Sequence, residues 1–242
     1  MSKRNLLRAI LAFPLVFSVN FGMAGDTDHQ PWSEAVFQHI HHTYGPSAEK
    51  RMRDWEAIIA KNYHAPIGTK LEVTNSWVNN LPWIADNKKY HANDYWATPL
   101  ETITTFGGDC EDMAISKFVM LRHMGVPSSK LRLAYVRVKR TGEAHMILLY
   151  IENSQKPVGQ REVKVLDNYV QTIKTGAERT DLVAIYSVDA DNNVTVYADD
   201  GNKRTVADTV EHAKLAKLDK IKREIAAYRA EYQKLNDGRP FY

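Results

Sequence analysis

The sequence predicts an α+β fold in which helices come first along the chain and an antiparallel sheet follows. Apolar residues recur at helical spacing in several segments before residue 125, whereas apolar runs bounded by turn residues recur between residues 131 and 198. Elements of one type followed by elements of the other are typical of the α+β class. A third observation, a charged segment with helical spacing over residues 205–235, adds a long C-terminal helix.

The N-terminal part of the chain has the start and stop signals of several helices. Gly45 and Pro46 separate the first two, and Ser47 is the expected N-cap of the second. A mixed segment over residues 94–106 ends in the pair Gly107-Gly108. The helices are expected over residues 32–42, 47–63, 69–80 and 110–124.

The helix expected over residues 110–124 follows the glycine pair directly. Gly125 suits its C-terminal cap. Its expected inner face consists of Met113, Phe118, Leu121 and Met124.

The sheet is expected to begin after this helix. In its first strand, Leu131, Leu133 and Tyr135 share one face, but Val136 and Val138 fall on the other, so the alternation slips. The strands are expected over residues 131–139, 144–151, 162–168, 182–188 and 194–198.

The C-terminal helix carries a short heptad-like seam. We expect it to pack on its own domain, because the seam is short for a coiled coil. Its residues are Leu218, Ile221, Ile225, Tyr228, Tyr232 and Leu235.

Residues 1–24 have the pattern of a secretory signal peptide. Lys3, Arg4 and Arg8 precede an apolar run, and small residues end at Ala24. The sequence therefore predicts a leader over 1–24, one domain over 25–200 and a helical extension over 201–242. Loss of the three basic leader residues would take the formal net charge from +3 to zero. No large basic field then remains, so no nucleic-acid partner is expected.

Cys110 is the single cysteine of the chain and lies where a helix is expected to begin. The positive end of the helix dipole favours a thiolate there. A lone cysteine is more often a small buried apolar residue, but the neighbouring carboxylates make an apolar burial costly. Cys110, His145 and Asp167 follow one another in the order of a thiol acyl-transfer triad. In this interpretation His145 shuttles the proton and Asp167 orients the imidazole.

Asp109, Glu111 and Asp112 flank the cysteine. Acids at a helix start are explained either by the helix dipole, as a solvated cap, or by a bound cation, for which calcium is the expected ion because it prefers hard oxygen ligands. Without a cation, these charges would raise the pKa of Cys110.

Several of these motifs resemble the bacterial transglutaminase-like cysteine proteases. The resemblance covers about residues 30–190 and rests on Asp94-Tyr95-Trp96-Ala97-Thr98-Pro99-Leu100-Glu101, Gly107-Gly108-Asp109-Cys110-Glu111-Asp112, Lys117-Phe118, Leu121-Arg122, His145-Met146-Ile147-Leu148-Leu149-Tyr150 and Leu166-Asp167-Asn168. It implies a papain-like, transglutaminase-type core, a Cys110–His145–Asp167 triad and calcium at Asp109, Glu111 and Asp112.

The resemblance also implies a biological setting. Members of the family are periplasmic endopeptidases that cleave a large surface adhesin near its N-terminus, and an inner-membrane receptor that senses cyclic-di-GMP restrains them. We expect a monomer that exposes apolar residues to such a receptor, with Trp32, Trp83 and Trp96 as candidates and Trp96 at the rim of the active site. Two alternatives stay open at this point: a transglutaminase or amidase, and a non-enzymatic periplasmic binding module.

Overall fold

The computed structural model describes residues 29, 31–191, 193–197 and 212–238. The expected leader, residues 1–24, and the first part of the expected C-terminal helix, residues 205–211, lie outside the described residues. Among the described residues, no helix is both long and apolar enough to cross a membrane.

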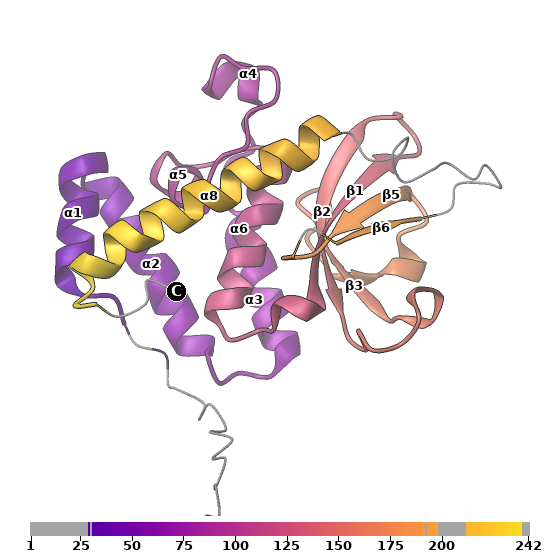
Figure 1. Cartoon of the computed structure of the whole chain (residues 1–242), viewed down its shortest axis with the longest axis horizontal. Coiled ribbons are helices and arrows are strands. Elements are labelled where there is room, and N and C mark those ends of the chain that lie inside the picture. Colours follow the sequence, from indigo (N-terminus) through magenta and orange to yellow (C-terminus); the bar gives the residue numbers. More distant parts are fainter. Residues whose placement is uncertain (1–28, 30, 192, 198–211, 239–242) are drawn as a thin grey trace, which may run out of the picture.

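The predicted α+β class is confirmed, because a group of helices packs beside one antiparallel sheet (Figure 1). The helices are α1 (Glu34–Tyr44), α2 (Pro46–Asn62), α3 (Ile67–Asn79), α4 (Asp86–Lys89), α5 (Pro99–Thr104), α6 (Cys110–His123) and α8 (His212–Leu235), with 3-10 turns η1 (Ser128–Lys130), η2 (Val158–Gln160) and η3 (Gly176–Glu178). The strands are β1 (Leu131–Val138), β2 (Ala144–Ile151), β3 (Val163–Leu166), β4 (Lys174–Thr175), β5 (Leu182–Val188) and β6 (Val194–Val196).

The sheet has the strand order β4-β3-β2-β1-β5-β6, and all neighbouring strands are antiparallel. The slip in alternation expected in the first strand has a structural counterpart, since the pairing of β1 with β5 shifts register between Tyr135 and Val136. The strands β2 and β1 lie at the centre of the sheet, so β2 is buried along nearly its whole length.

One local expectation about the helices is wrong. Ser47 is not the N-cap of α2: the helix begins at Pro46, whose missing N–H costs nothing at the first helical position, and Gly45 with φ +87° precedes it. The residues expected on the inner face of α6 do pack in the core, but the helix also packs against α3, α5 and the sheet and is buried on most of its other sides as well. The left-handed Gly125 does end α6 as predicted.

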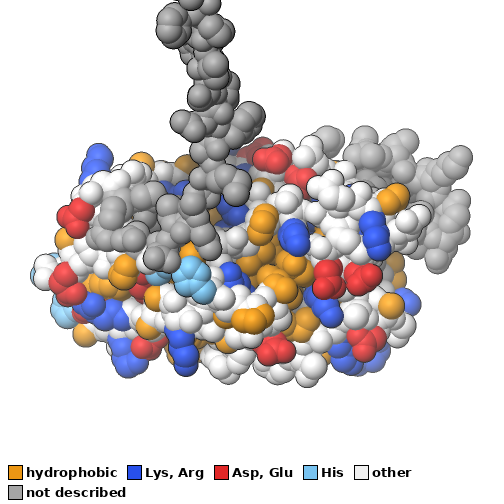
Figure 2. All heavy atoms as spheres, turned by 90° about the horizontal axis from the view of Figure 1, so that it is seen from below, with side chains coloured by type: hydrophobic (Ala, Val, Ile, Leu, Met, Phe, Trp, Pro, Cys, Tyr) orange, Lys and Arg blue, Asp and Glu red, His pale blue; other side chains and the backbone are white. Residues whose placement is uncertain are grey.

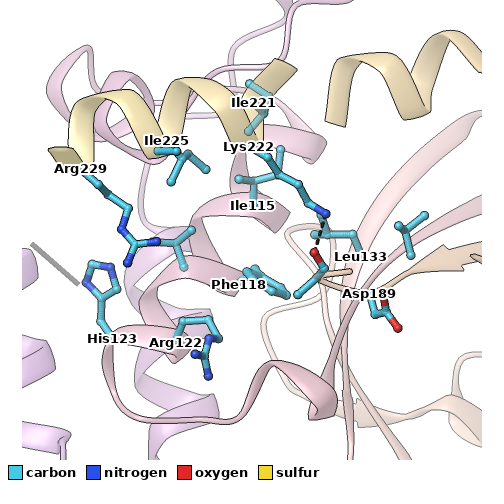
Figure 3. Close-up of a pocket in the computed structure, with 14 residues that line it drawn as sticks. Ile115, Phe118, Arg122, His123, Leu133, Asp189, Ile221, Lys222, Ile225 and Arg229 are labelled. Carbon is cyan, nitrogen blue, oxygen red and sulfur yellow. Dashed lines mark hydrogen bonds between the residues drawn. The ribbon is translucent and has the colours of Figure 1, made fainter. Parts of the chain in front are cut away.

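The helix α8 crosses the helical group diagonally in Figure 1, from the sheet to α1. Tyr232 is buried against the helical group and Ile221 in the apolar cluster that α6 shares with the sheet, so the helix packs on its own domain as expected. A cavity of about 330 Å³ lies between α8, α6 and the sheet; Phe118, Ile225 and Arg229 line part of it (Figure 3).

The described surface carries interspersed charges, as the face shown in Figure 2 illustrates, with apolar side chains gathered near its middle. Two of the three tryptophans expected at the surface are buried. Trp32 is only 6% exposed because it packs with Phe37. Trp96 is only 5% exposed because it belongs to the apolar cluster that α6 forms with the sheet. Trp83 is 54% exposed.

Candidate active site

The backbone of the glycine pair before α6 passes close to the backbone of residues 82–84, and this contact fixes the position of Cys110. Gly107 has φ +117°, and a side chain there would meet the carbonyl of Pro82. A Cβ on Gly108 would lie 2.4 Å from Asp112 Oδ2. The Gly108 N–H donates to the Pro82 carbonyl at 3.2 Å, and the Ile84 N–H donates to the Gly108 carbonyl at 3.0 Å. This contact therefore fixes the point at which α6 begins, and Cys110 is its first residue.

Cys110 and His145 line the same cavity, which has a volume of about 380 Å³. The Cys110 thiol donates to Glu111 Oε2 at 3.0 Å, and the backbone N–H of Met146 interacts with the sulfur. Packing of α6 on β2 brings the thiol and the imidazole to one place although they are far apart in sequence. The other lining residues include Trp83, Trp96, Asp109, Tyr135, Glu143 and Tyr169.

The thiol does not have the lowered pKa that the helix start alone predicts. Burial raises the pKa of Cys110 well above its ordinary value, and the charges of Glu111 and Asp109 raise it further. The helix dipole is thus outweighed by desolvation and by the neighbouring carboxylates. Any group that neutralises these carboxylates will favour the thiolate.

His145 and Asp167 form a buried pair. The two residues are 1% exposed each, and His145 Nε2 lies 2.7 Å from Asp167 Oδ1. His145 is at the start of β2 and Asp167 follows β3, so the antiparallel pairing of these strands brings them to the same edge. His145 Nδ1 is buried and has no hydrogen-bond partner among the described residues. This nitrogen is therefore the one available for proton exchange with a thiol.

Two further residues hold the pair, and sequence reasoning missed both. The Tyr169 ring stacks on His145 with ring centroids 4.1 Å apart, and its backbone N–H donates to Asp167 Oδ1 at 2.9 Å. The Arg179 guanidinium lies 2.7 Å from Asp167 Oδ2. Burial by itself would raise the pKa of Asp167, but the bonds and charges of His145, Tyr169 and Arg179 lower it to about 2.

The three acids flanking the cysteine belong to a larger cluster. Asp86 joins them from the start of α4 and Asp94 from the loop before α5. Asp94 lies in a motif already noted in the sequence, whereas Asp86 is in a segment without a periodic pattern. Three subsets bring their ligand atoms within 4.8 Å of one another: Asp86 with Asp109 and Asp112, Asp86 with Asp94 and Glu111, and Asp109 with Cys110 and Glu111.

The acidic cluster has unsatisfied buried oxygens. Asp86 Oδ1, Asp109 Oδ1 and Asp112 Oδ2 have no hydrogen-bond partner within the described part of the chain. The other oxygen of Asp112 accepts the Ala97 N–H at 2.7 Å. Burial, together with the neighbouring acids, raises the pKa of Asp109 strongly and that of Asp112 to about 7. Asp109 also makes no side-chain cap hydrogen bond to α6, so a solvated helix cap does not account for the cluster.

Comparison with known proteins identifies the family. Residues 38–185 match the family described as bacterial transglutaminase-like cysteine proteinase BTLCP. The chain belongs to this family. The matched region contains Cys110, His145 and Asp167 and ends before α8. No curated protein sequence matches the chain.

Solved structures of Legionella pneumophila LapG are similar to this member of the family. One is 28% identical, with a TM-score of 0.63, and the match covers 81% of this chain and 99% of LapG. A calcium-bound LapG structure (28% identity, TM-score 0.59) covers 76% of this chain and 97% of LapG, and an EGTA-treated one (28% identity, TM-score 0.64) covers 81% and 99%. This bacterial transglutaminase-like cysteine proteinase therefore shares its fold with a protein solved both with calcium and after EGTA treatment.

Proposed function

We propose that this proteinase is an exported, calcium-dependent endopeptidase whose catalytic residues are Cys110, His145 and Asp167. The observation that carries the proposal is the buried His145–Asp167 pair, which lies at the same cavity as the single cysteine. Membership in a cysteine proteinase family supports the assignment of the nucleophile.

The geometry supports a role for each atom of this triad. Asp167 Oδ1 accepts the Nε2–H of His145, which leaves Nδ1 unprotonated and able to take the proton of the Cys110 thiol. The thiolate attacks the scissile carbonyl, and the imidazolium returns its proton to the leaving amine. A water molecule, deprotonated by His145, then hydrolyses the thioester and regenerates the thiol.

The acidic cluster fits calcium. Carboxylate oxygens are the ligands that calcium prefers, and the buried oxygens of Asp86, Asp109 and Asp112 lack other partners among the described residues. The predicted ligands Asp109, Glu111 and Asp112 would hold the ion together with Asp86 and Asp94. When bound, the ion would neutralise the charges that raise the pKa of Cys110. The calcium-bound LapG structure supports this choice of ion.

The proposed setting follows the sequence resemblance. The substrate is a large surface adhesin cleaved near its N-terminus, the enzyme is a periplasmic monomer, and its cleavage of the adhesin promotes biofilm dispersal. An inner-membrane receptor that senses cyclic-di-GMP restrains it. Of the three candidate tryptophans, only Trp83 supports a receptor contact, because Trp32 and Trp96 are buried.

The proposal is tested by proteolysis of purified N-terminal fragments of large surface adhesins, in calcium and in EGTA. Wild-type protein is expected to cleave one of these fragments in calcium and to leave it intact in EGTA. Cys110→Ala and His145→Ala are expected to be inactive in both conditions. His42→Ala is the matched control, because His42 is an exposed histidine on α1 outside the cavity. Undiminished cleavage by folded Cys110→Ala would overturn the proposal.

A further inference from the structure

Arg179 is a buried arginine that bridges two carboxylates beside the His145–Asp167 pair. The residue is 6% exposed. Its Nη1 lies 2.7 Å from Asp167 Oδ2, while its Nε and Nη2 donate to the two oxygens of Asp181, each at 2.9 Å. The guanidinium is thus fixed by Asp181 on one side and offered to Asp167 on the other.

The local sequence holds Arg179 in this place. It follows the 3-10 turn η3, which begins with a capping box: the Thr175 side chain accepts the Glu178 N–H, and the Glu178 carboxylate accepts the Thr175 N–H at 2.8 Å. The Arg179 N–H donates to the Gly176 carbonyl, and β4, which leads into the turn, pairs with β3. The turn is therefore tied to the strand that precedes Asp167.

We propose that Arg179 is a positioning residue for the triad, which fixes one oxygen of Asp167 so that the other holds His145 in the tautomer needed for thiol activation. This inference rests on the proposed function. Since Oδ2 is taken by the guanidinium, Oδ1 remains for His145 Nε2 and the backbone N–H of Tyr169. The carboxylate cannot rotate without separating this buried ion pair.

The positive charge of Arg179 also favours the ionised form of Asp167. A carboxyl group as buried as Asp167 would ordinarily resist ionisation, and a protonated Asp167 would no longer select the Nε2–H form of the imidazole. The groups that act on Asp167 are His145, Arg179, the Tyr169 N–H, the more distant Asp181, and Lys117, which is buried on α6. Of these, Arg179 is the cation in direct contact with Oδ2.

Lysine cannot reproduce both effects. A lysine in place of Arg179 would supply the charge, but its ammonium group lacks the planar fork that reaches Asp167 and both oxygens of Asp181 at once. Substitution by lysine therefore separates charge from geometry, and substitution by glutamine removes both.

The test compares pH profiles of kcat/KM in saturating calcium for wild type, Arg179→Gln and Arg179→Lys. Arg179→Gln is expected to lower the maximal kcat/KM by about 10- to 100-fold, the range found when a contact that orients a metal-binding side chain is lost. It is also expected to move the acid limb of the profile to higher pH, because Asp167 then protonates more readily. Arg179→Lys is expected to keep the acid limb near its wild-type position while its maximum stays reduced.

The matched control is Arg132→Gln. Arg132 lies on β1 and pairs at 3.3 Å with Asp189, which follows β5, and neither residue lines the active-site cavity. The substitution is expected to leave the profile unchanged even where it lowers the melting temperature. Equal acid limbs in wild type and folded Arg179→Gln would overturn the inference.

Should Arg179→Gln not fold, Asp181→Asn serves instead, because it leaves the guanidinium but removes its support. A lower kcat with unchanged KM supports the inference, and unchanged kcat contradicts it. Failure of the proposed function is distinguishable, since wild-type protein would then show no Cys110-dependent cleavage to compare.

Discussion

Calcium binding is expected to release protons from the acidic cluster, so its affinity should rise with pH. Asp112 is fully buried, and its pKa is raised from 3.8 to about 7 by burial and by the neighbouring acids. The same causes raise the pKa of Asp109. At pH 6 both carboxyls are therefore largely protonated in the calcium-free protein, and the ion must displace those protons.

The size of the pH dependence of calcium affinity follows from the raised pKa of Asp112. Below pH 7 each lost unit of pH is expected to weaken calcium binding about tenfold for every displaced proton, which is about 1.4 kcal/mol per proton. Asp109 adds to this dependence, because its pKa is raised as well. In the absence of calcium, the raised pKa values favour the folded state at low pH, and this contribution to stability is lost as the pH rises through them.

Isothermal titration calorimetry in buffers of different ionisation enthalpy measures the released protons directly. We expect about one to two protons per calcium at pH 6 and fewer at pH 8. Asp112→Asn keeps the oxygen that accepts the Ala97 N–H but should remove about one of these protons. Asp54→Asn, an exposed acid paired with Lys50, is the control and should change nothing. A calcium affinity that stays constant from pH 6 to 9, without proton release, would show that these acids are already ionised in the calcium-free protein.

Other substitutions test the packing around the site. Gly108→Ala should destabilise the protein by about 1–3 kcal/mol, because its Cβ would lie 2.4 Å from Asp112 Oδ2, whereas Gly68→Ala, within a helix and with open space, should stabilise it by about 0.5–1 kcal/mol in urea unfolding. Tyr169→Ala should lower the single-turnover rate constant more than Tyr169→Phe does, since the ring stacks on His145. Equal rate constants for the two variants would exclude a role for the ring. Trp83→Ala should weaken binding of the enzyme to the proposed inner-membrane receptor by about 2 kcal/mol in surface plasmon resonance, and unchanged binding would exclude this surface.

The elements that can be predicted from the sequence are those whose local pattern matches their burial. The sequence predicts a strand over residues 144–151, and β2 occupies Ala144–Ile151, because an uninterrupted apolar run suits the centre of a sheet. The helix α4, with four residues, has no period to detect. Gly45-Pro46 indicates a boundary, but placing Pro46 inside the helix requires the geometry of the turn.

The candidate site likewise contains residues that the sequence predicts and residues that it does not. Cys110, His145 and Asp167 can be selected because each residue type has a chemical role and lies at the end of a regular element. Asp86 and Arg179 cannot, since they reach the site through the path of the chain and a side-chain contact that spacing does not encode. The pKa of Cys110 depends on burial and on the acids around it, so the helix start alone predicts its direction wrongly.

Activation of the thiol by His145 is measured most directly as the alkylation rate of the single cysteine by iodoacetamide at different pH values, in calcium, by intact mass spectrometry. Because Cys110 is the only thiol, every alkylated molecule reports on it. Wild-type protein is expected to be alkylated rapidly well below the ordinary cysteine pKa of about 8.5, and His145→Ala is expected to lose this reactivity. If both proteins are alkylated with the same pH dependence as an unfolded cysteine, His145 does not activate the thiol and the proposed triad is wrong.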